Sequence, residues 1–214
     1  MSLGTKRDGE DAATTDGRGL GRRAFLTGIA GAAATAGLAS LAGCTGGGGG
    51  GAVDEEVYVV AFHWGFRLVR PDGTVMDSMD LASGTRVAIH GINLEPIADG
   101  ADVDLPDPVA AAANENYHQW ERESLERIAP LMGVSVENLE GKLETAEEQY
   151  KDHGMALSDP SGSTLFDVTL PGDMSAPKTE TVTVDASGGY DLTCTTNCGV
   201  GHTYMELQDA FRVS

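Results

Sequence analysis

The sequence predicts a mainly β protein, a Greek-key β-sandwich or barrel that is interrupted by a helical insertion. Segments rich in Val, Tyr, Phe and Thr stand at both ends of the region 55–214, and turn residues such as Gly and Pro separate them. Short strands punctuated in this way are typical of sandwiches and barrels. Between the two groups of strands lies an Ala- and Glu-rich region whose apolar residues recur at helical spacing.

The first residues have the character of an export signal. Arg22 and Arg23 precede an uncharged run over 24–43, and the pattern resembles a twin-arginine signal. The run ends in Leu-Ala-Gly-Cys, which resembles the site where a lipoprotein signal is cleaved and Cys44 is lipidated. The alternative is a single transmembrane helix, although twelve of the twenty residues are Ala or Gly. We expect residues 1–43 to be removed, which leaves the protein lipid-anchored on the outer face of the cytoplasmic membrane.

A glycine-rich tether is predicted over residues 44–54, because six consecutive glycines follow Cys44 closely. The rest of the chain, 55–214, is the predicted domain, with its insertion at about 95–150. EVYVVAFHWGF (56–66) has the composition of one strand, and TRVAIHGINL (85–94) that of a second.

Two helices are predicted in the insertion, one over 107–129 and one that Ser135 can cap. Their apolar residues at helical spacing are Val109, Ala113, Tyr117 and Trp120 in the first helix and Leu139, Leu143, Ala146 and Tyr150 in the second. Strand character then returns in TLFDVTL (164–170), TETVTVDA (179–186), GYDLTC (189–194) and MELQDAFRV (205–213).

The segment CTTNCGVGHTYM (194–205) gathers potential metal donors. A disulfide between Cys194 and Cys198 would close so short a loop that it adds little stability, and it would leave His202 and Met205 without a role. Zinc would take both cysteines, His202 and a second histidine, but a thioether is a poor zinc ligand. Copper accepts a thioether, and two bridging thiolates can hold two copper ions side by side.

Cys194-x-x-x-Cys198-Gly-x-Gly-His202-x-x-Met205 resembles the binuclear CuA motif of cytochrome c oxidase subunit II and its relatives in the cupredoxin superfamily. VYVVAFHWGF, LPGDM and GGYDLTC also resemble stretches of that domain, so the resemblance covers roughly 55–94 and 151–213. It implies a cupredoxin-like fold in which the helical insertion is peculiar to this branch.

The resemblance also implies a set of copper ligands. Cys194 and Cys198 would bridge two coppers, His202 and the backbone carbonyl of Thr196 would complete one of them, and Met205 would belong to the other. The sixth ligand is a histidine followed by glycine, for which His153 and His90 are candidates. We favour His153, because two strands and Leu-Pro-Gly follow it in the family's order. His90 lies inside a predicted strand, and His63 and His118 are expected to be surface or structural residues.

The chain on its own is expected to be an electron carrier without a catalytic site, because the motifs G-x-S-x-G, H-E-x-x-H and the P-loop do not occur in it. The resemblance implies one-electron transfer from a small copper protein or cytochrome to the catalytic subunit of a terminal oxidase. Trp64 and Phe66 are candidates for an aromatic surface where electrons enter, with packing in the sandwich as their alternative role. Another respiratory reductase as acceptor, or copper binding and delivery without a respiratory role, are the alternative functions.

The net charge of the chain limits the classes of partner that it is expected to bind. The chain has 33 acidic and 14 basic residues and a formal net charge of -19. A nucleic-acid-binding protein needs a basic footprint, so nucleic acid is not an expected partner. An acidic surface of this kind fits a protein that stays soluble at high salt.

Overall fold

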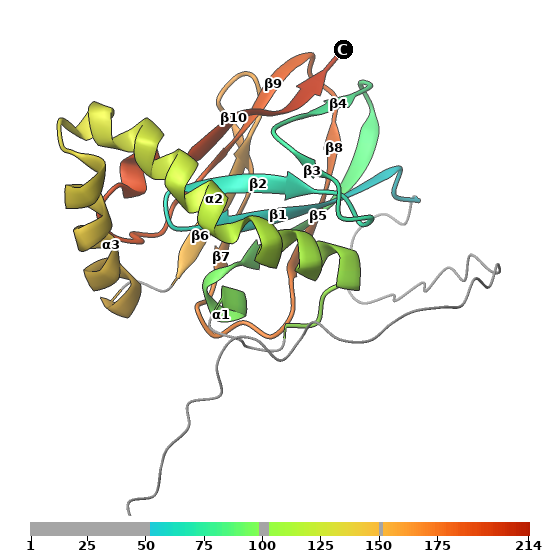
Figure 1. Ribbon diagram of the computed structural model, residues 1–214. Helices are drawn as coiled ribbons and strands as arrows, with labels where there is room; N and C mark the ends of the chain where they lie inside the picture. The colour runs from blue at the N-terminus through green and yellow to red at the C-terminus, as the bar shows by residue number, and fades with distance from the viewer. Residues whose placement is uncertain (1–51, 99–102, 150–151) are drawn as a thin grey trace, which may run out of the picture. The chain divides into compact units, whose positions relative to one another are not determined.

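The computed structural model describes residues 52–98, 103–149 and 152–214. Within these ranges, ten strands form two five-stranded sheets, accompanied by three α-helices and one 3-10 helix (Figure 1). The strands are β1 (Glu55–Phe62), β2 (Gly65–Val69), β3 (Val75–Met76), β4 (Met79–Leu81), β5 (Thr85–Asn93), β6 (His153–Ser158), β7 (Thr164–Leu170), β8 (Lys178–Val184), β9 (Gly188–Thr193) and β10 (Glu206–Val213). The helices are α1 (Glu95–Ala98), α2 (Asp107–Met132), α3 (Val136–Gln149) and the 3-10 helix η1 (His202–Tyr204). The predicted export signal, Cys44 and most of the tether lie outside the described residues.

Strand β1 is the centre of the first sheet, whose order is β3-β2-β1-β5-β8. It pairs antiparallel with β2 and parallel with β5. Its residues from Val57 to Phe62 are all buried, because both faces of the strand are covered. Val57, Val59 and Ala61 enter the core between the two sheets, and the alternate residues pack with the insertion. A strand that is covered on both faces has a continuous apolar sequence, as VYVVAF does.

The predicted single strand over 56–66 is wrong, because the chain reverses at His63 and Trp64. Phe62 pairs with Gly65, so this segment is a β-hairpin rather than one strand. Trp64, the second central residue of the turn, has a φ of 84°, in the left-handed region that Gly or Asn usually occupies there. Asn-Gly and Asp-Gly are the usual sequence signs of such a turn, and a His-Trp pair carries no such sign.

The second sheet has the order β4-β10-β9-β6-β7. Strands β6 and β9 pair antiparallel, as do β9 and β10, while β10 pairs parallel with β4. The four strands predicted after the insertion are present as β7, β8, β9 and β10. The core between the sheets takes side chains from both of them. The predicted mainly β sandwich with a helical insertion is therefore confirmed.

The insertion lies between β5 and β6 and contains α1, α2 and α3. Helix α2 has Pro108 in its first turn and ends at Gly133, whose φ of 68° lets its N–H cap the carbonyls of Ala129 and Pro130. Both predicted helices are present. Among the residues that the structure describes, no helix combines the length and the apolar character needed to cross a membrane.

Helix α2 crosses the outer face of the first sheet (Figure 1). Val109, Ala113 and Trp120, three of the residues predicted on its apolar face, are buried against β1 and β5. Further along, α2 and Leu139 of α3 form a separate apolar cluster around Trp64, and Tyr204 of η1 packs against this cluster. The insertion therefore covers the sheet and touches the loop that holds the cysteines.

Candidate metal centre

The loop between β9 and β10 brings the cysteines and the methionine together where these two strands meet. The backbone N–H of Cys194 donates to the carbonyl of Met205 at 3.0 Å, so the two ends of the loop are paired. The loop turns through η1, and the N–H of Met205 donates to the carbonyl of His202 at 3.1 Å. Backbone hydrogen bonds therefore set the positions of three of the predicted ligands.

The donor atoms of this loop converge on Cys198. Its Sγ lies 3.6 Å from the Sγ of Cys194, 3.6 Å from the Sδ of Met205 and 3.7 Å from the Nδ1 of His202. The carbonyl oxygen of Thr196 lies 3.2 Å from the Sγ of Cys194. Both cysteines are buried and free, so they form no disulfide.

His153 reaches the cysteines from the neighbouring strand. Strand β6 pairs with β9, with Ala156 opposite Thr193, and this register brings the start of β6 to the cysteine loop. One ring nitrogen of His153 lies within 4.8 Å of both cysteine sulfurs. Asp152 fixes the segment before it, because its Oδ1 accepts from the N–H of Gly172 at 2.8 Å. The structure thus places the predicted sixth ligand beside the other donors, and its ligand role stays a prediction.

The two cysteines have very different proton affinities. The hydrogen bond from Cys198, together with His153 and the N–H of Gly154, outweighs burial and lowers the pKa of Cys194 to about 3. The same hydrogen bond, burial and the Cys194 thiolate raise the pKa of Cys198 far above its usual range. Burial opposes the charge of His153, but the Cys194 thiolate and the Glu95 carboxylate outweigh it and raise the pKa of this imidazole. The pair of cysteines therefore carries one negative charge, and a second needs a cation beside it.

His90 and His118 lie apart from this cluster. His90 hydrogen-bonds Thr179 through Nδ1 at 2.8 Å, its Nε2 lies 3.1 Å from Glu56 Oε1, and its ring stacks on Tyr58. These contacts of His90 are typical of a structural residue. The side chain of His118 is 88% exposed.

Trp64 and Phe66 are both buried, so neither belongs to an exposed aromatic surface. The Trp64 ring occupies the space that a side chain at position 201 would need, and it therefore packs directly on the cysteine loop at Gly201. The packing alternative describes both residues. If Trp64 takes part in electron entry, the electron must pass through the protein interior to reach its buried ring.

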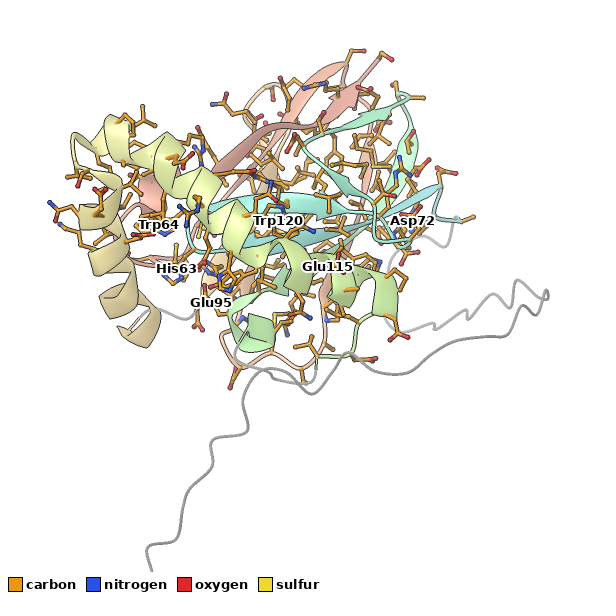
Figure 2. The ribbon with its side chains drawn as sticks, in the orientation of Figure 1. His63, Trp64, Asp72, Glu95, Glu115 and Trp120 are labelled. Atoms are coloured by element: carbon orange, nitrogen blue, oxygen red, sulfur yellow. The ribbon has the colours of Figure 1, made fainter. Side chains whose placement is uncertain are left out.

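Sequence reasoning missed a buried polar pair behind His153. His63 Nδ1 lies 2.6 Å from Glu95 Oε1, and the Nε2 of His153 lies 3.9 Å from the same oxygen. Burial favours the neutral form of Glu95, but the two histidines outweigh it and lower its pKa to about 2. Figure 2 shows His63 and Glu95 close together beneath α2. Glu95 belongs to the insertion, and no spacing rule in the sequence connects it with the cysteine motif.

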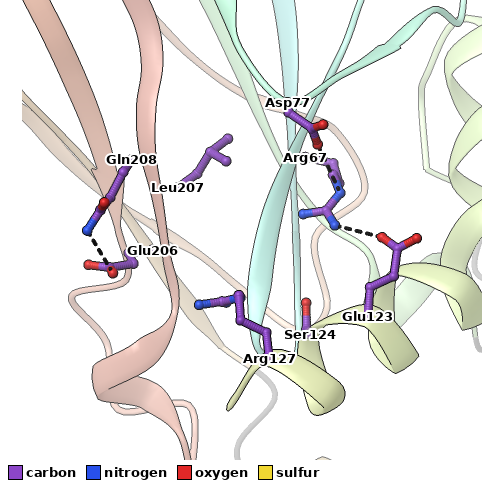
Figure 3. Close-up of a pocket in the computed structure, with 8 residues that line it drawn as sticks. All are labelled: Arg67, Asp77, Glu123, Ser124, Arg127, Glu206, Leu207 and Gln208. Atoms are coloured by element: carbon purple, nitrogen blue, oxygen red, sulfur yellow. Dashed lines mark hydrogen bonds and ion pairs between the residues drawn. The ribbon is translucent and has the colours of Figure 1, made fainter. Parts of the chain in front are cut away.

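Arg127 ties α2 to the cysteine loop. Its Nη2 donates to the carbonyl of Trp64 at 3.1 Å and to that of Tyr204 at 3.3 Å. It also borders a groove of about 510 Å³, which is lined on another side by Glu206, the residue after Met205 (Figure 3). In this groove Arg67 is paired with Glu123 at 3.0 Å and with Asp77 at 3.9 Å, so its charge is already balanced.

The residues present fit a copper centre. Two thiols, two imidazoles, a thioether and a carbonyl oxygen are grouped together, and copper accepts all of these donor types. Both ring nitrogens of His153 are buried without a hydrogen-bond partner among the described residues. Such orphaned polar groups are costly unless a metal or a proton acceptor satisfies them. Zinc prefers four ligands and disfavours the thioether.

No family model matches the sequence, and no curated protein matches it. The chain is similar to the periplasmic domain of subunit II of cytochrome oxidase from Bradyrhizobium japonicum, with 13% identity and a TM-score of 0.38 over 77% of this chain and 86% of that one. A chain of a heme-copper terminal oxidase dimer has 13% identity and a TM-score of 0.37, covering 75% of this chain and 65% of that one. Subunit II of a cytochrome c oxidase in a mixed disulfide with a thioredoxin-like protein has 12% identity and a TM-score of 0.36, covering 78% and 85%. At this level of similarity, the functional assignment rests on the residues of the candidate centre itself.

Proposed function

We propose that this chain is an extracytoplasmic electron-transfer protein with a binuclear CuA centre. The observation that carries the proposal is the pair of free, buried cysteine sulfurs 3.6 Å apart, with imidazole and thioether donors beside them. Cys194 and Cys198 would be shared by the two coppers, His153 and Met205 would hold one of them, and His202 and the Thr196 carbonyl would hold the other.

The protein's part in electron transfer is to hold the donors still and keep water away. A binuclear copper centre, when bound, accepts and releases one electron. The paired ends of the cysteine loop and the burial of Cys194, Cys198, Met205 and His153 limit the movement of the donors when the charge changes. His202 is half-buried, whereas the side chains of the other four proposed side-chain ligands are buried. We expect electrons to be exchanged with a partner on the side of His202.

The proposed partners are a small donor, either a copper protein or a cytochrome, and the catalytic subunit of a terminal oxidase. The proposed location is the outer face of the cytoplasmic membrane, with a lipid at Cys44 as anchor. The proposed partners follow from the resemblance to cytochrome c oxidase subunit II. The proposed location follows from the resemblance of the first residues to an export and lipidation signal. Another respiratory reductase is the alternative acceptor.

Copper loading followed by electron paramagnetic resonance tests the proposal. We expect two copper ions per chain and a hyperfine pattern from one electron shared equally by two copper nuclei. Cys198→Ser should abolish this pattern. His153→Ala should abolish it too, while the matched variant His90→Ala should leave it intact. A spectrum from a single copper nucleus, or a preference for zinc, would contradict the proposal.

Copper delivery is the competing function, and a transfer experiment separates it from electron transfer. The loaded and reduced protein is mixed either with an oxidised electron acceptor or with a copper-free acceptor protein. Electron transfer predicts that the spectrum of the first acceptor changes while the copper stays bound. Loss of copper to the second acceptor would favour delivery.

A further inference from the structure

The pair of His63 and Glu95 lies directly behind His153. The His63 ring meets the His153 ring edge-on, with 5.5 Å between the ring centroids. Glu95 Oε1 is held at 2.6 Å by His63 Nδ1 and lies 3.9 Å from His153 Nε2. His63 is 1% exposed, Glu95 9% and His153 0%, so the three groups meet in a place that water hardly reaches.

The fold sets the position of Glu95 through its neighbours. Glu95 is the first residue of α1, and its backbone N–H donates to the Oδ1 of the buried Asn93 at 3.1 Å. The side-chain amide of Asn93 in turn donates to the carbonyl of Leu170 at 3.1 Å. The backbone at Glu95 is therefore tied to the end of β5 and, through Asn93, to the end of β7.

A histidine that binds a metal through one ring nitrogen carries a proton on the other, and this proton needs an acceptor. The Nε2 of His153 has no hydrogen-bond partner among the described residues, and at 3.9 Å it is too far from Glu95 for a hydrogen bond. A rotation of the imidazole that brings Nε2 within about 3 Å of the Glu95 carboxylate would supply the missing acceptor. Outer carboxylates of this kind fix the orientation of a ligating imidazole and raise its basicity.

We propose that Glu95, supplied by the helical insertion and held by His63, is a positioning residue that orients His153 by accepting its Nε2 proton. The proposal rests on the proposed copper centre. It gives the insertion a function at the centre itself, in addition to covering the sheet.

The alternative is a separate metal site made of His63, Glu95 and His153, because their donor atoms all lie within 4.8 Å of one another. It offers only three protein donors, and one of them, His153, also lies within 4.8 Å of the two cysteine sulfurs. The 2.6 Å contact between His63 and Glu95 is the length of a strong hydrogen bond, which leaves no room for an ion between these two atoms. The positioning role is therefore favoured.

Two substitutions of Glu95, made in the full chain loaded with copper, distinguish its effect on the orientation of His153 from the effect of its negative charge. Glu95→Ala removes the acceptor, and copper affinity should fall about 10- to 100-fold, with unequal hyperfine couplings from the two coppers. Glu95→Gln keeps an oxygen that accepts the proton, so the hyperfine pattern and the affinity for reduced copper should stay near those of the unsubstituted protein. Because it removes a negative charge, Glu95→Gln should favour the reduced state about tenfold, a rise of about 59 mV in potential.

Two further variants complete the test. His63→Phe keeps a ring in the same place but removes the partner of Glu95, and it should weaken copper binding in the same direction as Glu95→Ala. Glu115→Gln is the control, since Glu115 is an exposed carboxylate of helix α2 in the same insertion. Its copper affinity and spectrum should not change.

The outcomes are distinct. If the unsubstituted protein shows no binuclear spectrum, the proposed function fails, and this inference fails with it. If that spectrum is present but Glu95→Ala matches it in affinity, hyperfine pattern and potential, only the positioning role is overturned, even if the melting temperature falls. A third metal equivalent that disappears in Glu95→Ala and His63→Phe would overturn it in favour of a separate metal site.

Discussion

Gly154 and Gly201 show how strongly the candidate centre depends on residues that donate nothing to a metal. A Cβ at Gly154 would meet the Oγ1 of Thr195 and would lie 2.6 Å from the backbone nitrogen of Thr196. The absence of a side chain also lets the N–H of Gly154 donate to the Sγ of Cys194 at 3.3 Å. Gly201 has a φ of 96° and faces the Trp64 ring. Both glycines therefore allow close approaches that position the donors.

Gly154→Ala should displace the cysteine loop, because the new methyl group would overlap Thr195 and the backbone of Thr196. We expect a loss of about 1–3 kcal/mol in the free energy of unfolding and weaker copper binding, measured by denaturant titration and by competition with a chelator. Gly141→Ala is the matched control, since nothing lies within 4 Å of its Cβ position in α3, and it should be neutral or stabilising. Equal effects of the two substitutions would contradict the steric argument.

Copper loading should release at least one proton, which comes from Cys198. Without metal, Cys194 is a thiolate with a pKa of about 3, whereas the raised pKa of Cys198 keeps that thiol protonated at neutral pH. The proposed centre would hold copper through both thiolates and would require the loss of this proton, so apparent copper affinity should fall about tenfold per pH unit as the solution is acidified. The fall should be steeper where His153, whose pKa is also raised, must lose a proton too.

Calorimetry in buffers of different ionisation enthalpy counts the protons that are released. Met205→Leu is a suitable control, because a thioether carries no proton, so its affinity should change while its proton count does not. Copper affinity that does not vary with pH would show that both cysteines are already thiolates in the metal-free protein.

At the scale of elements, α2 acts as a brace between the first sheet and the cysteine loop. Its early turns cover β1 through Val109, Ala113 and Trp120. Its later turns pack around Trp64. Arg127 then binds the carbonyls of Trp64 and Tyr204, which belong to the β1–β2 turn and to η1. A disturbance of α2 should therefore be felt at the candidate centre.

Arg127→Ala should leave both carbonyls without this donor and loosen η1. We expect a cost of about 1–3 kcal/mol in the free energy of unfolding and faster exchange of the Tyr204 and Met205 amides with deuterium. Arg122→Ala, an exposed arginine of the same helix, is the control and should change stability by no more than about 0.5 kcal/mol. If both variants exchange these amides at the same rate, α2 does not brace the loop.

Some features of these elements could be predicted from the sequence and others could not, and the difference has physical reasons. Val109, Ala113 and Trp120 could be predicted as a buried face because helical periodicity survives in the sequence. The hairpin at His63 and Trp64 could not, because Trp64 adopts a positive φ without the usual turn residues. Glu95 could not be linked to His153, because their proximity depends on how β5 and β6 lie in different sheets.

At the scale of the whole molecule, the sandwich gathers donors from opposite ends of a long stretch of chain. Strand pairing of β6 with β9 brings His153 to the cysteines although β7 and β8 separate the two strands in sequence. The order of the motifs predicted this partner, whereas periodicity alone could not, since His90 also stands before a glycine in a strand. The strand composition predicted a two-layer β fold, but which strands pair depends on packing between residues far apart in the chain.

The net charge of -19 predicts that the stability of the whole molecule depends on salt concentration. Like charges on the surface repel one another in the compact state, and salt screens them, with a Debye length of about 10 Å at 0.1 M and about 3 Å at 1 M. The melting temperature should therefore rise with potassium chloride from about 0.05 to 1 M, by about 2–4 °C for each kcal/mol gained. A variant in which the exposed Glu115, Glu126 and Glu140 are replaced by Gln should melt higher at low salt and respond less to added salt. A melting temperature that falls with salt, or an equal response of the variant, would show that surface repulsion does not limit the stability of this fold.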